Sequence, residues 1–216
     1  MAKNQGLFDA VCLGKRDDVI EIVNQAIEGG DNAVEILMDS MIPAMRDIGD
    51  RFARNEVYVP EMLIAARAMQ SGMDIIEPIL VEAGHQPIAK VAIGTVKGDL
   101  HDIGKNLVGM MLKGAGYQVI DKGVDCSIED FQAAVDDEGA QAVCCSALLT
   151  TTMPYMQEIV NHFKETTGFD GKDEVKVVVG GAPITQAYAD KIGAHGFSDN
   201  ASGAVTAVAD SLGIQI

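Results

Sequence analysis

The spacing of apolar residues changes near residue 85, and this change divides the chain into two predicted parts. Before it, apolar side chains recur every three or four residues, which is typical of amphipathic helices. After it, short apolar runs alternate with helical patterns, as they do in βα units. We therefore predict two domains, residues 1–85 and residues 86–216, joined by the segment Gly-His-Gln-Pro at residues 84–87.

The first domain is predicted to contain four helices, of which the first is short. Asp17 is a candidate N-cap for the second helix, which ends at the glycine pair 29–30. The third begins near Asn32, and Pro60 suits the first turn of the fourth. Each helix carries an apolar face, so the four can pack together as a four-helix bundle.

The second domain is predicted to be a doubly wound, flavodoxin-like α/β domain. Five βα units follow one another, and each apolar strand is followed by a helical pattern. Ligands of such parallel sheets bind beyond the carboxyl ends of the strands, so candidate site residues are sought there. The predicted strands lie near residues 90–95, 117–121, 142–146, 175–179 and 196–198.

Composition excludes several classes of function. The 216 residues carry a formal net charge of −16, which disfavours binding to nucleic acids and to anionic membrane surfaces. No apolar run is long enough to span a bilayer, and the first residues lack the hydrophobic core of a signal peptide, so a cytoplasmic protein is expected. The cysteines lack zinc-like spacing, and neither disulfides nor a zinc site are expected for Cys12, Cys126, Cys144 and Cys145.

The segment Asp99-Leu100-His101-Asp102-Ile103-Gly104 follows the first predicted strand and opens a helix. A neutral imidazole binds a metal through one ring nitrogen when its other N–H has a fixed acceptor, and Asp99 is near enough in sequence to be that acceptor. By itself the pattern is weak. Asp102 can simply cap the helix, and a lone loop histidine is more often solvated or locally hydrogen-bonded than a metal ligand.

Small and polar residues also follow two later strands. One strand runs into Ser146 and the segment Ala-Leu-Leu-Thr-Thr-Thr, and the next runs into Gly180-Gly181-Ala182-Pro183. Taken alone, the Gly-Gly-Ala-Pro segment reads as an ordinary loop. Because carboxyl ends of parallel strands meet at one sheet edge, the three loops are predicted to converge on one site.

In this order the D-x-H-x-x-G, S-x-L and G-G motifs form a three-part signature. Over residues 1–216 the chain resembles the small corrinoid proteins of methylamine, glycine betaine and methanol methyltransfer systems, and the cobalamin-binding module of methionine synthase. The resemblance implies a cobalamin whose benzimidazole base is displaced from cobalt, with His101 as the metal ligand. It implies that the cofactor-binding residues are Gly98, Asp99, Leu100, His101, Asp102, Gly104, Ser146, Leu148, Thr150, Thr152, Gly180, Gly181 and Ala201.

Residue types explain these positions. Glycines let the backbone approach a bulky ligand without Cβ clashes, and this is expected of Gly94, Gly98, Gly104, Gly180 and Gly181. Hydroxyls can bond to the bases or the phosphate and ribose oxygens of a nucleotide tail, and this is expected of Ser146, Thr150 and Thr152.

The resemblance implies a methyl carrier. Co(I) accepts a methyl group from a substrate-specific methyltransferase, here for a methylated or quaternary amine, and methyl-Co(III) gives it to a second methyltransferase that uses tetrahydrofolate or coenzyme M. A reductive activation protein is a further implied partner, and the chain alone is expected to catalyse nothing. The helical domain is expected to cap the reactive corrin face, with Tyr58, Met62 and Leu63 as candidate contacts.

Other functions stay open at this point. A cobalamin-dependent sensor shares the helical cap, but such regulators usually add a basic DNA-binding module for which this chain has neither length nor charge. A subunit of an adenosylcobalamin mutase normally lacks the preceding bundle. A carrier for methanol or aryl methyl ethers is a third alternative, and a cofactor-free signalling domain of the same fold is a fourth, because fold does not fix function.

Overall fold

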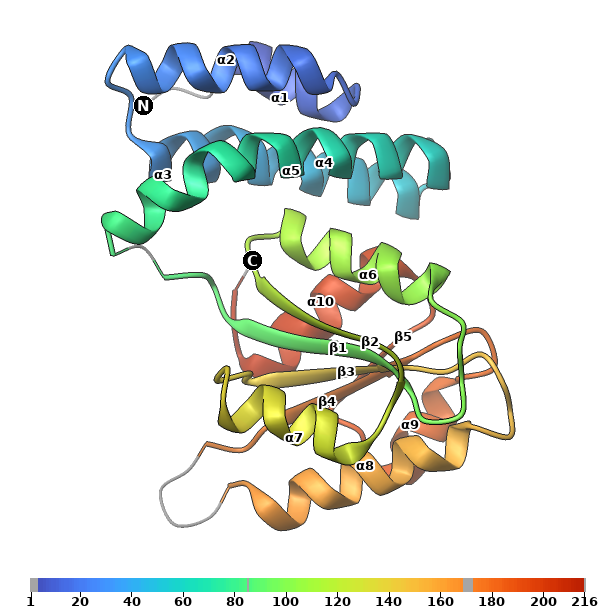
Figure 1. Ribbon diagram of the computed structural model, residues 1–216. Helices are drawn as coiled ribbons and strands as arrows, with labels where there is room; N and C mark the ends of the chain where they lie inside the picture. Colours follow the sequence, from blue (N-terminus) through green and yellow to red (C-terminus); the bar gives the residue numbers. More distant parts are fainter. Residues whose placement is uncertain (1–3, 85, 169–172, 216) are drawn as a thin grey trace. The chain divides into compact units, whose positions relative to one another are not determined.

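The computed structural model describes residues 4–84, 86–168 and 173–215 (Figure 1). Contacts divide the chain into two compact units, residues 1–87 with 113–116 and residues 88–112 with 117–216. We refer to them as the helical unit and the α/β unit. Residue 85, where the sequence predicts the domain boundary, lies outside the described residues.

The helical unit confirms the predicted helical N-terminal region. Its third predicted helix consists of a short α-helix, a π-helical turn and a longer α-helix in direct succession. Within the π-helical turn, the buried Ser40 hydroxyl accepts a hydrogen bond of 2.9 Å from the backbone N–H of Asn4. The elements of the unit are α1 (Gln5–Cys12), α2 (Arg16–Glu28), α3 (Ala33–Ile36), the π-helix η1 (Leu37–Met41), α4 (Ile42–Ala53) and α5 (Val59–Glu82).

Helix caps agree with the sequence at some positions and differ at one. The Asn32 side chain caps α3 by accepting from the backbone N–H of Val34, and proline 60 lies in the first turn of α5. The expectation for Asp17 was wrong, because α2 begins at Arg16 with Lys15 in the N-cap position. A tight turn at Gly14, with φ of +67°, starts the helix earlier and leaves Asp17 in its first turn.

The α/β unit confirms the predicted doubly wound sheet. Among the described residues, the five strands pair in parallel in the order β2-β1-β3-β4-β5, with Val91 opposite Val119 on one side and Ala142 on the other. Helices α6 and α10 cover one face, and α7, α8 and α9 cover the other (Figure 1). The elements are β1 (Lys90–Val96), α6 (Ile103–Gly114), β2 (Gln118–Cys126), α7 (Ile128–Asp136), β3 (Ala142–Ser146), α8 (Met153–Thr166), β4 (Lys176–Gly180), α9 (Gln186–Ile192), β5 (Gly196–Ser198) and α10 (Ala201–Leu212).

Strand β2 is longer than the sequence predicts. The sequence predicts a strand near residues 117–121, whereas the strand continues to Cys126 along β1 with register shifts after Ile93 and Gly94. An edge strand exposes much of its surface and needs no continuous apolar pattern. The extension matters because it carries the end of β2 beside the loop that leaves β1.

The core of the α/β unit fixes the identity of Gly94 in β1. A Cβ atom at this position would lie 2.8 Å from both Cys126 Sγ and Phe131 Cζ, two buried side chains. The glycine is therefore required by packing inside the protein, and the expectation that it admits a bulky ligand was wrong.

We predict that Gly94→Ala lowers the free energy of unfolding by about 1–3 kcal/mol, because the added methyl group overpacks the core. Gly109→Ala in α6 is the matched control, since its Cβ would meet no atom closer than 3.8 Å and alanine favours a helix. Urea unfolding followed by circular dichroism gives both midpoints. Equal midpoints for the two variants would contradict this account of Gly94.

Candidate functional site

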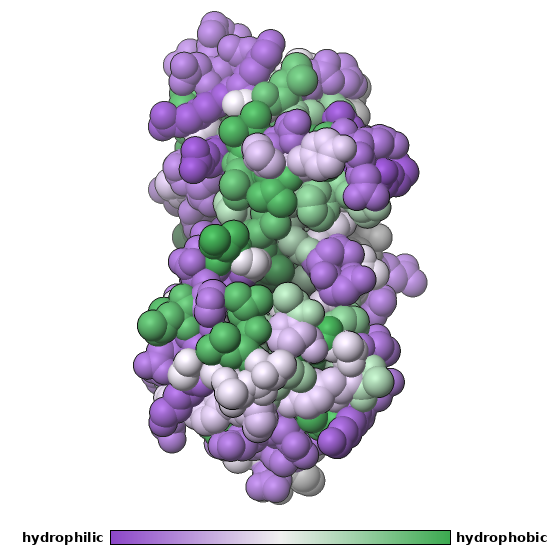
Figure 2. Space-filling model, turned by 90° about the vertical axis from the view of Figure 1, so that its right-hand side faces the viewer, coloured by the Kyte–Doolittle hydropathy of each residue, from purple (hydrophilic) through white to green (hydrophobic). Residues whose placement is uncertain are grey.

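The candidate site lies at the carboxyl edge of the sheet, where the loops after β1 and β3 lie next to each other. These two strands are neighbours in the sheet, but the chain leaves them toward opposite sides, which makes their ends the switch point of the topology. Figure 2 views the molecule from this side and shows apolar side chains exposed among polar ones. Four large apolar side chains in or next to the two loops are between 40% and 82% exposed, namely Leu100, Ile103, Leu148 and Leu149.

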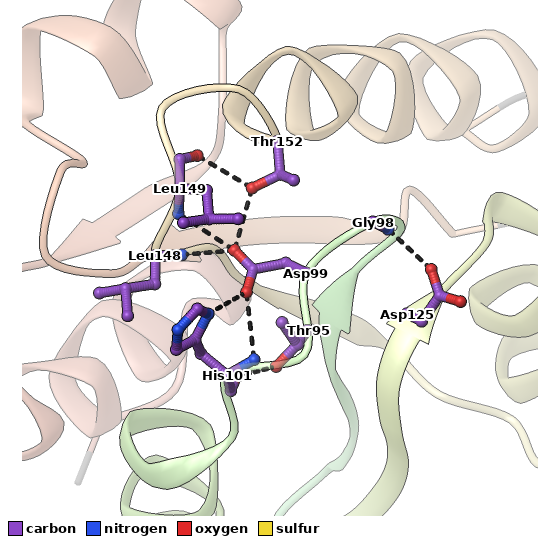
Figure 3. Close-up of polar contacts among 8 residues, drawn as sticks. All are labelled: Thr95, Gly98, Asp99, His101, Asp125, Leu148, Leu149 and Thr152. Atoms are coloured by element: carbon purple, nitrogen blue, oxygen red, sulfur yellow. Dashed lines mark hydrogen bonds and ion pairs between the residues drawn. The ribbon is translucent and has the colours of Figure 1, made fainter.

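Asp99 is the centre of the polar contacts (Figure 3). Its side chain is fully buried, and the described residues give its carboxylate five hydrogen bonds. Oδ1 accepts from the backbone N–H of His101 at 3.1 Å and from the ring Nδ1 of His101 at 2.7 Å. Oδ2 accepts from the backbone N–H groups of Leu148 and Leu149, at 2.8 and 3.1 Å, and from the Thr152 hydroxyl at 2.9 Å.

These contacts keep Asp99 ionised. Burial alone would raise the pKa of Asp99, but the hydrogen bond from Leu148 N–H, the His101 ring, and the N–H groups of His101 and Leu149 together hold that pKa well below its ordinary value. An ionised carboxylate accepts hydrogen bonds only. The proton shared with the ring therefore stays on Nδ1 of His101.

His101 is placed so that its other ring nitrogen is available. Its side chain is 52% exposed, and no hydrogen bond to Nε2 occurs among the residues that the structure describes. The Thr95 hydroxyl in β1 donates to the backbone carbonyl of His101 at 2.8 Å, and this hydrogen bond joins the loop to β1. With Nδ1 bonded to Asp99, Nε2 is the ring nitrogen whose lone pair is free to bind a metal.

A cavity of about 250 Å³ lies beside the start of α6, between the ends of β3, β4 and β5. Five predicted site residues line it, namely Gly104, Ser146, Gly180, Gly181 and Ala201. At Gly104 a Cβ would meet nothing within 4 Å, so this position is open. At Gly181, with φ of +134°, a Cβ would lie 1.9 Å from the carbonyl oxygen of Ala147, so this glycine is required by the neighbouring loop.

The other predicted residues lie in or next to the loops after β1 and β3. Leu100 and Asp102 are exposed, and Asp102 accepts a hydrogen bond from the Asn106 side chain at 3.0 Å. Thr150 is exposed and does not line the 250 Å³ cavity. The expectation that the Thr152 hydroxyl bonds to a nucleotide was wrong: this hydroxyl is buried and bonded to Asp99, because the turn before α8 brings it under the carboxylate.

Sequence reasoning missed several residues at this edge. Ser198, Asp199 and Asn200 line the cavity after β5, and the rule that ligands bind at strand ends was sufficient to find them. The buried amine of Lys105 in α6 pairs with both carboxylate oxygens of Asp121 in β2 at 2.6 Å, a contact for which the sequence holds no local signal.

The cysteines of the sheet are protonated packing residues. Cys126, Cys144 and Cys145 are buried, and burial raises the pKa of Cys126 to about 11 and that of Cys144 to about 12. Thiols with such pKa values are not nucleophiles at neutral pH.

The residues present fit a metal bound in a macrocycle. Among the described residues, no group of three or more His, Cys, Asp and Glu side chains is arranged to hold a metal ion by itself. If such a macrocycle is bound, His101 Nε2 would be the atom of this site that holds its metal. The exposed leucines beside it suit the apolar surface of a large ligand, and the neighbouring cavity can admit an attached group.

In the helical unit, Tyr58 is 64% exposed, Leu63 is half-buried and Met62 is fully buried. Their expected contact with the reactive face stays a prediction.

Among the described residues, no helix has the length and apolar character needed to cross a membrane.

Comparison with known proteins gives two matching family models. Both are described as a B12 binding domain, and they match residues 89–209 and residues 4–77. A trimethylamine corrinoid protein of Methanosarcina barkeri is 39% identical over 196 residues, covering 90% of this chain and 89% of the relative. A corrinoid protein of Desulfitobacterium hafniense is 36% identical over 210 residues and covers 96% of each chain.

Solved structures of other proteins also resemble this chain. A chain in the crystal structure of a methanol:cobalamin methyltransferase complex from Methanosarcina barkeri matches with a TM-score of 0.83 and 27% identity, covering 96% of this chain and 78% of that chain. A cobalamin-binding protein from Desulfitobacterium hafniense matches with a TM-score of 0.76 and 27% identity, covering 96% and 97%.

We predict that Asp99→Asn lowers stability at neutral pH by about 2–3 kcal/mol, because the amide places N–H groups against N–H donors. The pKa of Asp99 is lower in the folded than in the unfolded chain, so its contribution is complete above the unfolded value of about 3.9 and declines as the pH falls below it. The difference between wild type and variant should therefore shrink toward about pH 3.

Urea midpoints measured at about pH 7 and about pH 3 check this linkage. Asp190→Asn is the control, since Asp190 is an exposed carboxylate of the same unit. A pH-independent gap between wild type and Asp99→Asn would contradict the argument.

Proposed function

The chain belongs to the corrinoid proteins with B12-binding domains, and from this premise we propose that it is a methyl carrier between two methyltransferases. It binds cobalamin or a related corrinoid. The proposal depends on one observation above all, which is the buried Asp99 carboxylate bonded to Nδ1 of the half-exposed His101.

The bound corrinoid supplies the chemistry, because its cobalt takes up a methyl group and releases it to an acceptor. His101 Nε2 would hold the metal of that cofactor. Asp99 keeps a proton on Nδ1 and so leaves the Nε2 lone pair free. Leu148, Leu149 and Thr152 in turn hold Asp99, so that the ring orientation depends on the loop after β3.

The cavity between the strand ends is the proposed site for the nucleotide tail of the corrinoid. Its position supports this role, since it opens beside Gly104, only three residues after His101. Ser146 offers a hydroxyl there, and the open position at Gly104 lets a bulky group approach the backbone. We propose that Gly98, Leu100, Asp102, Leu148 and Thr150 border the ring itself.

The proposed methyl donor is a methylated or quaternary amine, presented by a substrate-specific methyltransferase. The names of the relatives support this class, because they include trimethylamine and dimethylamine corrinoid proteins. A relative of known structure belongs to a methanol:cobalamin methyltransferase complex, which supports a methyltransferase partner. Further proposed partners are a second methyltransferase that uses tetrahydrofolate or coenzyme M, and a reductive activation protein.

A capping role for the helical domain, residues 1–85, is also proposed. The family resemblance supports it, and so does the match of residues 4–77 to a B12 binding domain model. In this proposal residues 86–216 would hold the corrinoid, and the helical domain would limit the access of water to it.

We predict that His101 coordinates cobalt in the protein loaded with cob(II)alamin. Protein labelled with ¹⁵N-histidine should show a two-line nitrogen splitting in electron paramagnetic resonance, because ¹⁵N has half the nuclear spin of ¹⁴N. His101→Ala should lose that splitting, and His162→Ala, whose imidazole bonds to Gln132, should keep it. A three-line splitting in the wild type would show that the cofactor's own base stays on cobalt, and would refute the ligand assignment.

We predict that the loaded protein alone turns over no methylated amine. With one substrate-specific methyltransferase added, uptake should stop at about one methyl group per bound corrinoid, since the carrier has no acceptor. Adding a methylcorrinoid:tetrahydrofolate or coenzyme M methyltransferase should make transfer catalytic. Mass spectrometry of the released cofactor counts the methyl groups, and enzymes specific for trimethylamine, dimethylamine and methanol identify the donor class. Catalytic demethylation by the chain alone would refute the carrier function.

A further inference from the structure

Asp125, near the end of β2, has an uncommon backbone conformation. Its φ is +56°, and Asn55 is the other non-glycine residue with positive φ in the described part of the chain. Asparagine and aspartate tolerate this left-handed region better than other residues, but glycine adopts it with less strain. Keeping a side chain here is therefore unfavourable for the backbone by itself, so the carboxylate needs another explanation.

The side chain and the backbone of Asp125 each form a hydrogen bond to the loop that leaves β1. Its Oδ1 accepts from the backbone N–H of Gly98 at 2.7 Å, as Figure 3 shows. Its own backbone N–H donates to the carbonyl oxygen of Asp99 at 3.0 Å. Asp125 thus bonds to two consecutive residues, at the N–H of Gly98 and at the C=O of Asp99, and the second of them carries the buried carboxylate.

From these contacts we infer that Asp125 is a positioning residue for the metal ligand. Its carboxylate holds the N–H of Gly98 and its backbone N–H holds the C=O of Asp99, so that the backbone of both residues is fixed. This backbone sets where the Asp99 side chain lies, and Asp99 sets the orientation of the His101 ring. The inference rests on the proposed function, because it assigns the ligand role to His101. It adds a residue of the edge strand β2 to the site. The rule that ligands bind at strand ends, applied to β1, β3 and β4, does not predict this residue.

Other contacts hold the region around the loop, so the effect of Asp125 should be local. The Thr95 hydroxyl holds the carbonyl of His101 at 2.8 Å, and the Lys105–Asp121 pair joins the first turn of α6 to β2. These contacts do not involve Asp125. Removing its carboxylate should therefore loosen residues 98–101 without unfolding the α/β unit.

Two substitutions at this position separate the carboxylate from the backbone. Asp125→Gly removes the acceptor, keeps the N–H that bonds to Asp99 and relaxes the positive φ. Asp125→Asn keeps an acceptor oxygen and tolerates the same φ. Asn55→Gly is the matched control, since it introduces glycine at the other positive-φ position, in the helical unit.

The first measurement uses the cofactor-free protein. Hydrogen exchange by NMR should show the backbone N–H of His101, which bonds to Asp99 Oδ1, exchanging roughly fivefold to tenfold faster in Asp125→Gly. Asp125→Asn should stay within about twofold of wild type, because its amide oxygen still accepts from the N–H of Gly98, although a neutral acceptor binds more weakly than a carboxylate. Asn55→Gly should leave this rate unchanged. An unchanged rate in Asp125→Gly, or equal acceleration in both Asp125 variants, would overturn the inference.

The second measurement loads the same proteins, labelled with ¹⁵N-histidine, with cob(II)alamin. Asp125→Gly should reduce the ratio of histidine-coordinated to uncoordinated cobalt by roughly fivefold to tenfold, and Asp125→Asn should restore most of it. A wild-type protein without the two-line splitting would refute the ligand role of His101, and with it this inference. A wild type with the splitting and an Asp125→Gly variant identical to it would overturn the positioning role alone.

Discussion

The rest of the site depends on the burial of one negative charge. A carboxylate removed from water is stable only when its oxygens are hydrogen-bonded, and Asp99 obtains its five donors from the loops after β1 and β3. Because three donors come from the loop after β3, the two loops are joined through this one side chain. The same bonds that offset desolvation also keep the charge that holds the proton on His101 Nδ1.

The parallel sheet makes that arrangement possible. Its order β2-β1-β3-β4-β5 places the ends of β1 and β3 next to each other and leads their chains apart, which leaves space between the loops for a ligand. The ends of β4 and β5 extend that space into the cavity lined by Ser146, Gly180 and Asn200. In the proposed function, this one topology would therefore accommodate both the ring, at the loops, and the tail, in the cavity.

The geometry also explains why the carrier would not select the methyl donor. In the proposed function, His101 and the cavity would hold the corrinoid and would not contact the methyl donor. These residues would therefore not distinguish an amine from an alcohol. Relatives named for trimethylamine and dimethylamine, and one found in a methanol methyltransferase complex, accordingly share this chain's fold or sequence. In the proposed function, donor selection belongs to the partner enzyme.

Much of this protein follows from its sequence alone. Helical periodicity and apolar strand runs predict the helical region and the five parallel strands, because both patterns arise from local geometry. The spacing of Asp99 and His101 predicts their hydrogen bond, since two residues of one loop are within reach of each other. The rule that strand ends converge likewise brings Ser146, Gly180 and Gly181 to one cavity.

The tertiary structure decided what depends on distant contacts. Thr152 bonds to Asp99 across 53 residues of sequence, and Asp125 reaches Gly98 across 27, so no local pattern could assign either partner. Gly94 and Gly181 look like ligand-facing glycines in the sequence, yet a Cβ there would collide with other parts of the protein. Residue type and spacing specify which groups can do the chemistry, whereas close packing between remote segments decides which atoms each of them meets.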